Sequence, residues 1–199
     1  MILFYSANSP YARIARITLR EAGLTGNVQE RLAESRSPNN PVLDHSPVGR
    51  VPTLVTDTLV ITETNRVYDF LKSKSVSAEL SALAEPTLKV IEQEGQILGF
   101  IDGITCWVRE NRRDVVGRSV FLISVETDRS ARCLSYLERA AQAGGLPEFL
   151  TFRGMALAVG LDLMDFNKLV PEWKSAYPHL SDWLMQVKAR ETMIETAPI

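Results

Sequence analysis

Hydrophobic and polar positions in the first part of the chain predict short strands around one helix. Residues 2–5 form a continuous apolar run, which is typical of a strand buried on both faces. Ser9 then places a favoured helix-capping residue before a proline, and the apolar positions that follow recur at helical spacing up to Gly23. A second strand is predicted over residues 28–32.

Residues 53–73 predict a hairpin followed by a helix. Two apolar runs, 53–55 and 59–61, flank a polar turn, and Thr62 is a predicted helix N-cap with Glu63 in the first turn. With the elements before it, the order is strand, helix, strand, then two strands and a helix. This βαβ-ββα order is the thioredoxin-like one, and we expect its first crossover to be right-handed.

After residue 86 the strand patterns end and long 3.6-residue periods replace them. Helices are predicted over 87–111 and about 118–143, and a third begins at Thr151. The third is apolar on all sides, which predicts a buried central helix.

The two patterns are separated by a serine-rich stretch of small residues with weak periodicity. Such composition is typical of a linker between domains. The predicted organisation is an α/β thioredoxin-like domain over residues 1–75, a linker over 76–85 that ends beside Pro86, and an all-helical domain over 86–199.

Composition excludes several classes of function. Of the 199 residues 45% are hydrophobic and 23% charged, and the net charge of −2 gives no electrostatic footprint for nucleic acid or an anionic membrane. No apolar run has the length of a membrane span, and the N-terminal run lacks the features of a signal peptide. Two distant cysteines, Cys106 and Cys133, favour a reducing compartment, so we expect a cytoplasmic protein. Isolated His45 and His179 predict no metal site.

Val51-Pro52 is the most informative dipeptide, because proline removes a backbone donor directly before a predicted strand. If the bond between them is cis, the N–H and C=O of Val51 can pair with an extended peptide as an added strand would. The next helix start offers free amides, a hydroxyl and a carboxylate. Together these groups suit a small peptide with a charged amino-acid head, although an ordinary hairpin followed by a helix cap remains the alternative.

The same residues resemble a known family. Pro-x-Gly-Arg-Val-Pro-x-Leu over residues 47–54, followed by Glu63-Thr64, is similar to the glutathione-binding segment of cytosolic glutathione S-transferases, here of a bacterial, serine-type kind. The resemblance implies that Val51 pairs with the cysteinyl backbone of glutathione and that Glu63 and Thr64 hold its γ-glutamyl end. The glutathione-binding residues so predicted are Ser9, Arg50, Val51, Pro52, Glu63 and Thr64.

Ser9 is the predicted catalytic residue. Ser9-Pro10-Tyr11-Ala12 resembles the Cys-Pro-Tyr-Cys of thioredoxin-like proteins with serine for the first cysteine, so thiol–disulfide exchange is not expected. A free thiol has a pKa of about 8.5, and a hydroxyl that donates to sulfur at a helix N-terminus favours the thiolate. A plain N-cap role is the alternative for Ser9. Ser6 is a competing hydroxyl, and Tyr5 a weaker one.

The resemblance implies a glutathione transferase that uses glutathione as co-substrate, joins its thiolate to a small hydrophobic electrophile in detoxification, and forms a homodimer. Tyr11, Phe100 and Trp107 are the predicted walls of the electrophile pocket, and packing is an alternative role for the last two. A glutathione-binding protein with little turnover and a glutathione-dependent isomerase or dehalogenase remain alternatives.

The start of the third long helix departs from the family pattern. Family members carry Ser/Thr-x-x-Asp there, whereas this chain has Thr151-Phe152-Arg153-Gly154. The missing aspartate predicts a weaker cap.

Overall fold

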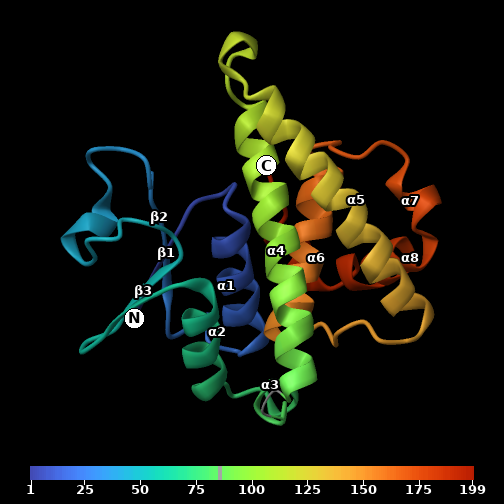
Figure 1. Ribbon diagram of the computed structural model, residues 1–199. Helices are drawn as coiled ribbons and strands as arrows, with labels where there is room; N and C mark the ends of the chain where they lie inside the picture. Colours follow the sequence, from blue (N-terminus) through green and yellow to red (C-terminus); the bar gives the residue numbers. More distant parts are fainter. Residues whose placement is uncertain (85–86) are drawn as a thin grey trace. The chain divides into compact units, whose positions relative to one another are not determined.

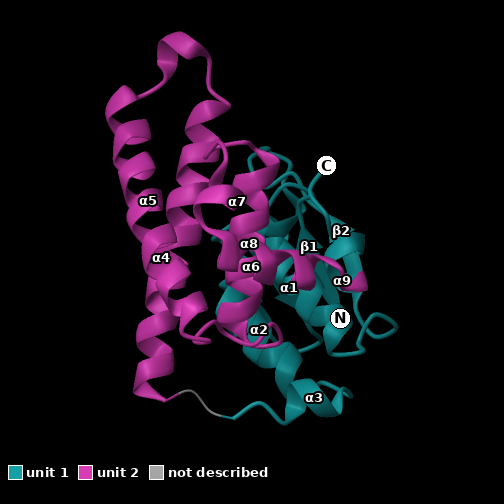
Figure 2. Cartoon of the chain, turned by 90° about the vertical axis from the view of Figure 1, so that its right-hand side faces the viewer, with its two compact units in different colours: residues 1–84, 192–199 teal, residues 85–191 magenta. Residues whose placement is uncertain are grey.

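The computed structural model describes residues 1–84 and 87–199, which form two compact units (Figure 2). Unit 1 contains residues 1–84 and 192–199, and unit 2 contains residues 85–191. This division differs from the predicted domain boundaries in two respects, because unit 1 includes residues 76–84, predicted as linker, and residues 192–199, predicted in the helical domain. The predicted linker 76–85 carries the short helix α3 (Ala78–Ser81), and Glu85 and Pro86, at its end, lie outside the described residues.

Unit 1 is built on a four-stranded mixed sheet in the order β2-β1-β3-β4. Strand β1 runs parallel to β2 and antiparallel to β3, which in turn pairs antiparallel with β4. This is the predicted thioredoxin-like arrangement, with β2 beginning one residue later than predicted and β4 shifted by one residue toward the C-terminus. The strands are β1 (Ile2–Tyr5), β2 (Gln29–Leu32), β3 (Thr53–Val55) and β4 (Val60–Thr62), and the 3-10 helix η1 (Pro41–Asp44) lies between β2 and β3.

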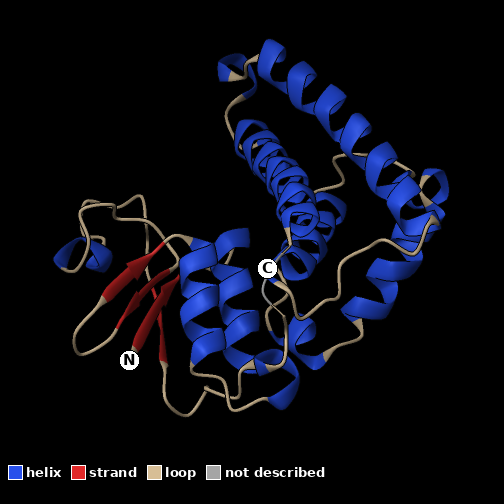
Figure 3. Ribbon diagram, turned by 60° about the horizontal axis from the view of Figure 1, so that its bottom comes forward, coloured by secondary structure: helices blue, strands red, loops and turns tan. Residues whose placement is uncertain are grey.

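Helices α1 (Pro10–Glu21) and α2 (Thr64–Ser73) lie side by side next to the sheet (Figures 1 and 3). On α1 the apolar positions at helical spacing, Ile14 and Ile17, are buried together with Leu3 and Leu54 of the sheet. Burial of such side chains is the main favourable contribution to folding, at about 1.5–3 kcal/mol each. The apolar positions at helical spacing on α1 are therefore buried, as such spacing predicts.

Unit 2 is helical in its described part, as predicted. Helix α6 is buried along nearly its whole length, which confirms that it is the buried central helix. Helix α4 packs against both α6 and α5 (Figure 1). The elements are α4 (Leu88–Asn111), η2 (Val115–Gly117), α5 (Val120–Gln142), α6 (Phe152–Phe166), α7 (Trp173–Ala176) and α8 (Pro178–Lys188), and α9 (Glu191–Glu195) crosses from unit 2 into unit 1.

The start of α6 keeps its cap despite the missing aspartate. The Thr151 hydroxyl accepts a hydrogen bond from the Gly154 amide at 3.1 Å and donates one to the Glu148 carbonyl at 2.6 Å. A Cβ atom at Gly154 would lie 2.0 Å from that same carbonyl oxygen. Glycine stands here because the backbone at Glu148 folds against the first turn and leaves no room for a side chain.

We predict that Gly154→Ala lowers the free energy of unfolding by about 2 kcal/mol or more, because the added carbon forces the backbone apart. Gly154→Asp, which restores the family pattern, should destabilise as well. The matched control is Gly99→Ala on α4, where a Cβ would meet nothing within 4 Å and where alanine should stabilise by about 0.5–1 kcal/mol. Urea unfolding measures all three, and an unchanged midpoint for Gly154→Ala would contradict this account.

Glu138 of α5 caps the start of α8. Its carboxylate accepts hydrogen bonds from the backbone amides of His179 at 3.1 Å and Leu180 at 2.9 Å, and its Oε1 lies 2.7 Å from the His179 ring nitrogen Nδ1. Burial by itself raises the pKa of the Glu138 carboxyl, but these hydrogen bonds outweigh it, so the pKa lies below the usual value.

A carboxyl with a lowered folded-state pKa stabilises fully above its unfolded pKa, about 4.3, and this contribution is lost as pH falls through the lower folded value. We therefore predict that Glu138→Gln lowers stability at neutral pH by about 1–3 kcal/mol and flattens the acid side of the stability curve. Melting temperature against pH measures both effects. Glu92→Gln, at an exposed position on α4, is the control and should leave the curve unchanged.

Candidate functional site

Strand register brings three separate segments to one end of the sheet. Phe4 near the end of β1 pairs with Thr53 at the start of β3, and Thr53 pairs with Thr62 at the end of β4. In antiparallel pairs, the residues that leave one strand lie beside those that enter the next. The segments that meet at this end are 6–9 after β1, Val51-Pro52 before β3, and Glu63-Thr64 after β4.

The Val51-Pro52 peptide bond is cis, which is the condition under which the sequence predicted a peptide-binding backbone. The Val51 side chain packs against the buried cluster that contains Phe4 and Val42. Among the described residues no backbone hydrogen bond uses the N–H or C=O of Val51. Both groups are therefore available to an added extended strand.

Two residues that the sequence analysis did not single out hold this segment. The Thr53 hydroxyl donates to the Arg50 carbonyl at 2.7 Å, and the amide of buried Asn40 donates to the Gly49 carbonyl at 2.7 Å. Gly49 has φ of 62°, and a Cβ atom there would lie 2.8 Å from Leu43 Cδ2. An asparagine directly before Pro41 was the available signal, because asparagine is a favoured N-cap and Pro41 begins η1.

Ser9 is the N-cap of α1, as predicted. Its hydroxyl oxygen accepts a hydrogen bond from the Ala12 amide at 3.1 Å, and the side chain is half-buried. A serine hydroxyl is both acceptor and donor, so its proton remains available for a group at the helix start, where the helix dipole favours negative charge. The capping role and the predicted role beside a thiolate are thus compatible.

Tyr5 ends β1, and Ser6 follows it in the loop that leads to α1. The Ser6 carbonyl accepts from the Ser9 amide at 3.1 Å, which ties the two serines into one turn, and both side chains are half-buried. The Tyr5 ring lies beneath the Arg16 guanidinium at 4.3 Å from the ring centroid. The contact involves the ring face and not the phenol hydroxyl, so Tyr5, like Ser6, stays an alternative to Ser9.

Glu63 differs from its predicted position. Thr62 was predicted as the N-cap and Glu63 in the first turn, but Thr62 ends β4 and Glu63 is itself the N-cap, with φ of 66°. The physical reason is the pairing of Thr62 with Thr53, which keeps Thr62 extended and leaves one residue to turn the chain into α2. Such a backbone costs about 1–3 kcal/mol for a non-glycine residue and is typical of functional sites.

The side chains of this junction face different surroundings. Glu63 is exposed and makes no capping hydrogen bond, whereas Thr64 is buried at 9% exposure. Arg50, on the neighbouring segment, is exposed. The sheet end therefore carries two exposed charged groups. The Arg50 guanidinium comes before Val51 in the sequence, and the Glu63 carboxylate comes after it.

The predicted pocket residues belong to different units. Tyr11 is half-buried in the first turn of α1, whereas Phe100 and Trp107 lie in the core of unit 2 at 1% and 7% exposure. The Phe100 ring packs on α6, where a Cβ atom at Gly160 would lie 3.2 Å from it. The role of all three as pocket walls stays a prediction.

The absence of a side chain at Gly103 of α4 leaves room for a group on a neighbouring helix. That group is the carboxylate of Glu126 on α5, since a Cβ atom at Gly103 would lie 2.6 Å from its Oε2. Burial raises the pKa of the nearby α5 thiol, Cys133, above its usual value, which opposes thiolate formation there.

Over residues 1–84 and 87–199 no group of His, Cys, Asp and Glu is arranged to hold a metal ion, and no described helix has the length and apolar character to cross a membrane.

Comparisons with known proteins find similarity to glutathione S-transferases. A family model described as the glutathione S-transferase N-terminal domain matches residues 8–74, which include all six predicted glutathione-binding residues. The uncharacterized GST-like protein YibF of Escherichia coli strain K12 is 27% identical over 207 residues, and the match covers 100% of this chain and 98% of that protein.

Solved structures share the fold of the whole chain. A glutathione S-transferase from Methylobacillus flagellatus KT with glutathione bound has a TM-score of 0.85 at 22% identity, over 100% of this chain and 99% of that one. A glutathione transferase family member from Pseudomonas fluorescens Pf-5 with bound glutathione has a TM-score of 0.83 at 24% identity, over 100% and 98%. At these identities the likeness shows a common fold.

Proposed function

We propose that this chain, which belongs to the glutathione S-transferase family, binds glutathione at the described sheet end and joins its thiolate to a small hydrophobic electrophile. One observation carries the proposal. Strand register places the Ser9 turn, Val51-Pro52 and Glu63-Thr64 at the same end of one sheet, although they are far apart in the sequence. In line with the family resemblance, we extend the proposal to a homodimer.

In this proposal the tripeptide lies as an added strand along Val51. The unused N–H and C=O of Val51 pair with the cysteinyl backbone, as in other strand additions. The exposed Glu63 carboxylate meets the γ-glutamyl ammonium group, and the start of α2 at Thr64 receives the γ-glutamyl carboxylate. Arg50 provides a cation for the glycyl carboxylate.

The Ser9 hydroxyl then donates to the sulfur. The thiol releases its proton to solvent, the thiolate attacks the electrophilic carbon, and a carbon–sulfur bond forms as the electrophile accepts the electron pair or expels its leaving group. A hydrogen bond to a charged group contributes about 1.5–3 kcal/mol, and one pKa unit corresponds to about 1.4 kcal/mol. One such bond therefore lowers a thiol pKa from about 8.5 to near 7, which leaves a large thiolate fraction at neutral pH.

We predict that Ser9→Ala lowers the rate of conjugation about tenfold or more and raises the pKa of the bound thiol by about one unit, because the donor to sulfur is lost. The pH profile of kcat/KM with an aryl halide measures both. Ser6→Ala is the matched control, since Ser6 lies in the same turn. If Ser6→Ala shows the loss and Ser9→Ala does not, the thiolate partner is Ser6. Binding of glutathione without its consumption by any electrophile would favour the binding-protein alternative. Turnover of a substrate without net consumption of glutathione would favour the isomerase alternative.

We predict that Glu63→Gln weakens glutathione binding about tenfold, because a charge-assisted contact to the ligand ammonium becomes a neutral one. Titration calorimetry with the reduced tripeptide measures the dissociation constant. Glutathione acetylated at the amino group is the matched ligand and should bind the wild type and the variant equally. Equal weakening for both ligands would place the effect of Glu63 in the backbone of the junction and not in a charge contact.

A further inference from the structure

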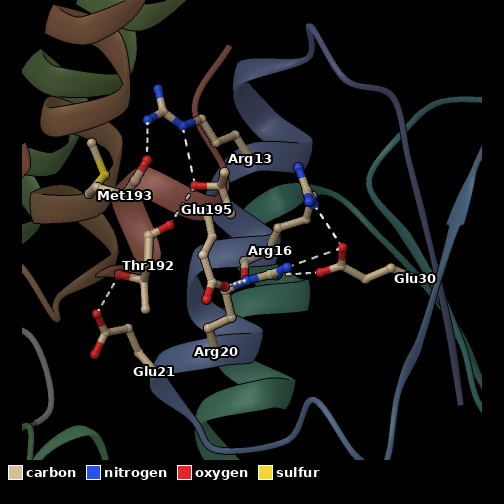
Figure 4. A network of polar contacts seen from close by, with 9 residues as sticks. Arg13, Arg16, Arg20, Glu21, Glu30, Thr192, Met193 and Glu195 are labelled. Carbon is tan, nitrogen blue, oxygen red and sulfur yellow. Dashed lines mark hydrogen bonds and ion pairs between the residues drawn. The ribbon is translucent and has the colours of Figure 1, made fainter. Parts of the chain in front are cut away.

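The last residues of the chain belong to unit 1 and lie along α1 (Figure 4). We call residues 192–199 the terminal segment. The hydrogen bonds between it and α1 join residues more than 170 positions apart in sequence. The proposed function gives this segment no role, yet it contacts the helix whose first turn carries Ser9.

Arg13 makes the contact nearest to Ser9. Its side chain is only 5% exposed, and its guanidinium donates to the Met193 carbonyl at 3.0 Å and to the Thr196 hydroxyl at 3.4 Å. Thr196 is itself 1% exposed and donates to the Thr192 carbonyl at 2.7 Å. A buried cation is strongly disfavoured when acceptors are removed, so this contact ties the segment to α1.

Two further contacts hold the other end of α1. The Arg20 guanidinium donates to the Glu195 carboxylate at 2.7 Å, and the Thr192 hydroxyl donates to the Glu21 carboxylate at 2.7 Å. Arg20 also pairs with Glu30 of β2, which lowers the pKa of the Glu30 carboxyl although burial opposes this. Helix α1 is therefore held by polar contacts from both β2 and the terminal segment (Figure 4).

The backbone connects these contacts to the site. The Arg13 amide donates to the Ser9 carbonyl at 2.9 Å, so the residue that binds the terminal segment also closes the first helical turn at Ser9. A displacement of about 1 Å in a reacting group can lower a rate about a hundredfold. We propose that the terminal segment positions α1, with Arg13 as the positioning residue, so that the Ser9 hydroxyl is held where the sulfur of glutathione lies. This inference rests on the proposed function of Ser9.

The test is Thr196→Val, which keeps the side-chain shape and removes the hydroxyl that Arg13 contacts. We expect the pKa of the bound thiol to rise toward its free value of about 8.5 and kcat to fall about tenfold, with the dissociation constant of glutathione unchanged within about twofold. Glutathione affinity is spared because its proposed contacts are on β3 and α2. Thr196→Ser, which restores the hydroxyl, should restore both values, and Thr192→Val should show a smaller effect of the same kind.

Two controls separate positioning from general destabilisation. Thr127→Val removes a comparable hydroxyl bond on α5, to the Ile123 carbonyl at 2.8 Å, and should change neither value. Glu138→Gln lowers stability in unit 2 and should leave the thiol pKa unchanged. A folded Thr196→Val protein with wild-type kcat and thiol pKa would overturn the inference. The inference would also be overturned if Glu138→Gln changed kcat and the thiol pKa as Thr196→Val does.

A second readout keeps this inference separate from the proposed function. Hydrogen exchange at the Ala12 and Arg13 amides needs no substrate, and it should accelerate in Thr196→Val but not in Thr127→Val. If wild-type protein does not ionise bound glutathione, the proposed function fails, and exchange decides the positioning role of the terminal segment by itself. Unchanged exchange at these amides in Thr196→Val would overturn the positioning role of the terminal segment.

Discussion

The antiparallel pairing of β3 with both neighbours is the constraint on which the site depends. Phe4, Thr53 and Thr62 stand in register across three strands, so the chain leaves β1, enters β3 and leaves β4 at the same end of the sheet. A shift by one residue would turn every side chain of a strand to the other face. The buried positions of Leu3 and Leu54 oppose such a shift, and the core thereby fixes the site.

Helix α1 has a double role in this arrangement. Its apolar face belongs to the core, and its N-cap, Ser9, supplies the hydroxyl that we propose as the partner of the thiolate. Its arginines contact β2 and the terminal segment, so the polar face as well as the apolar one makes contacts within unit 1. A catalytic group at a helix start needs such support, because chemistry depends on position to within a fraction of an ångström.

Parts of the fold were predictable because their signals are local. Short apolar runs and helical spacing identified the strands and helices, and the capping residues Ser9 and Thr151 marked helix starts. The strand-to-helix junction was not predictable to the residue. Thr62 is a good N-cap by its chemistry, but pairing with Thr53 keeps it extended, so the turn moved to Glu63. Likewise, the sequence shows Gly154 only as the loss of an aspartate. The structure shows that the Glu148 carbonyl leaves no room for a side chain at this position.

By itself the sequence determined the order of elements, the apolar faces and a motif that resembles the glutathione-binding segment of glutathione S-transferases, since each depends on neighbours within a few positions. Arg13, Arg16 and Arg20 recur at spacings of three and four residues, which places them on one face of a helix. Only the tertiary structure decided what that face contacts, because the partners are Glu30 and a terminal segment more than 170 positions away. Contacts between distant segments leave no periodic trace in a single sequence, and they exist only once the core has brought those segments together.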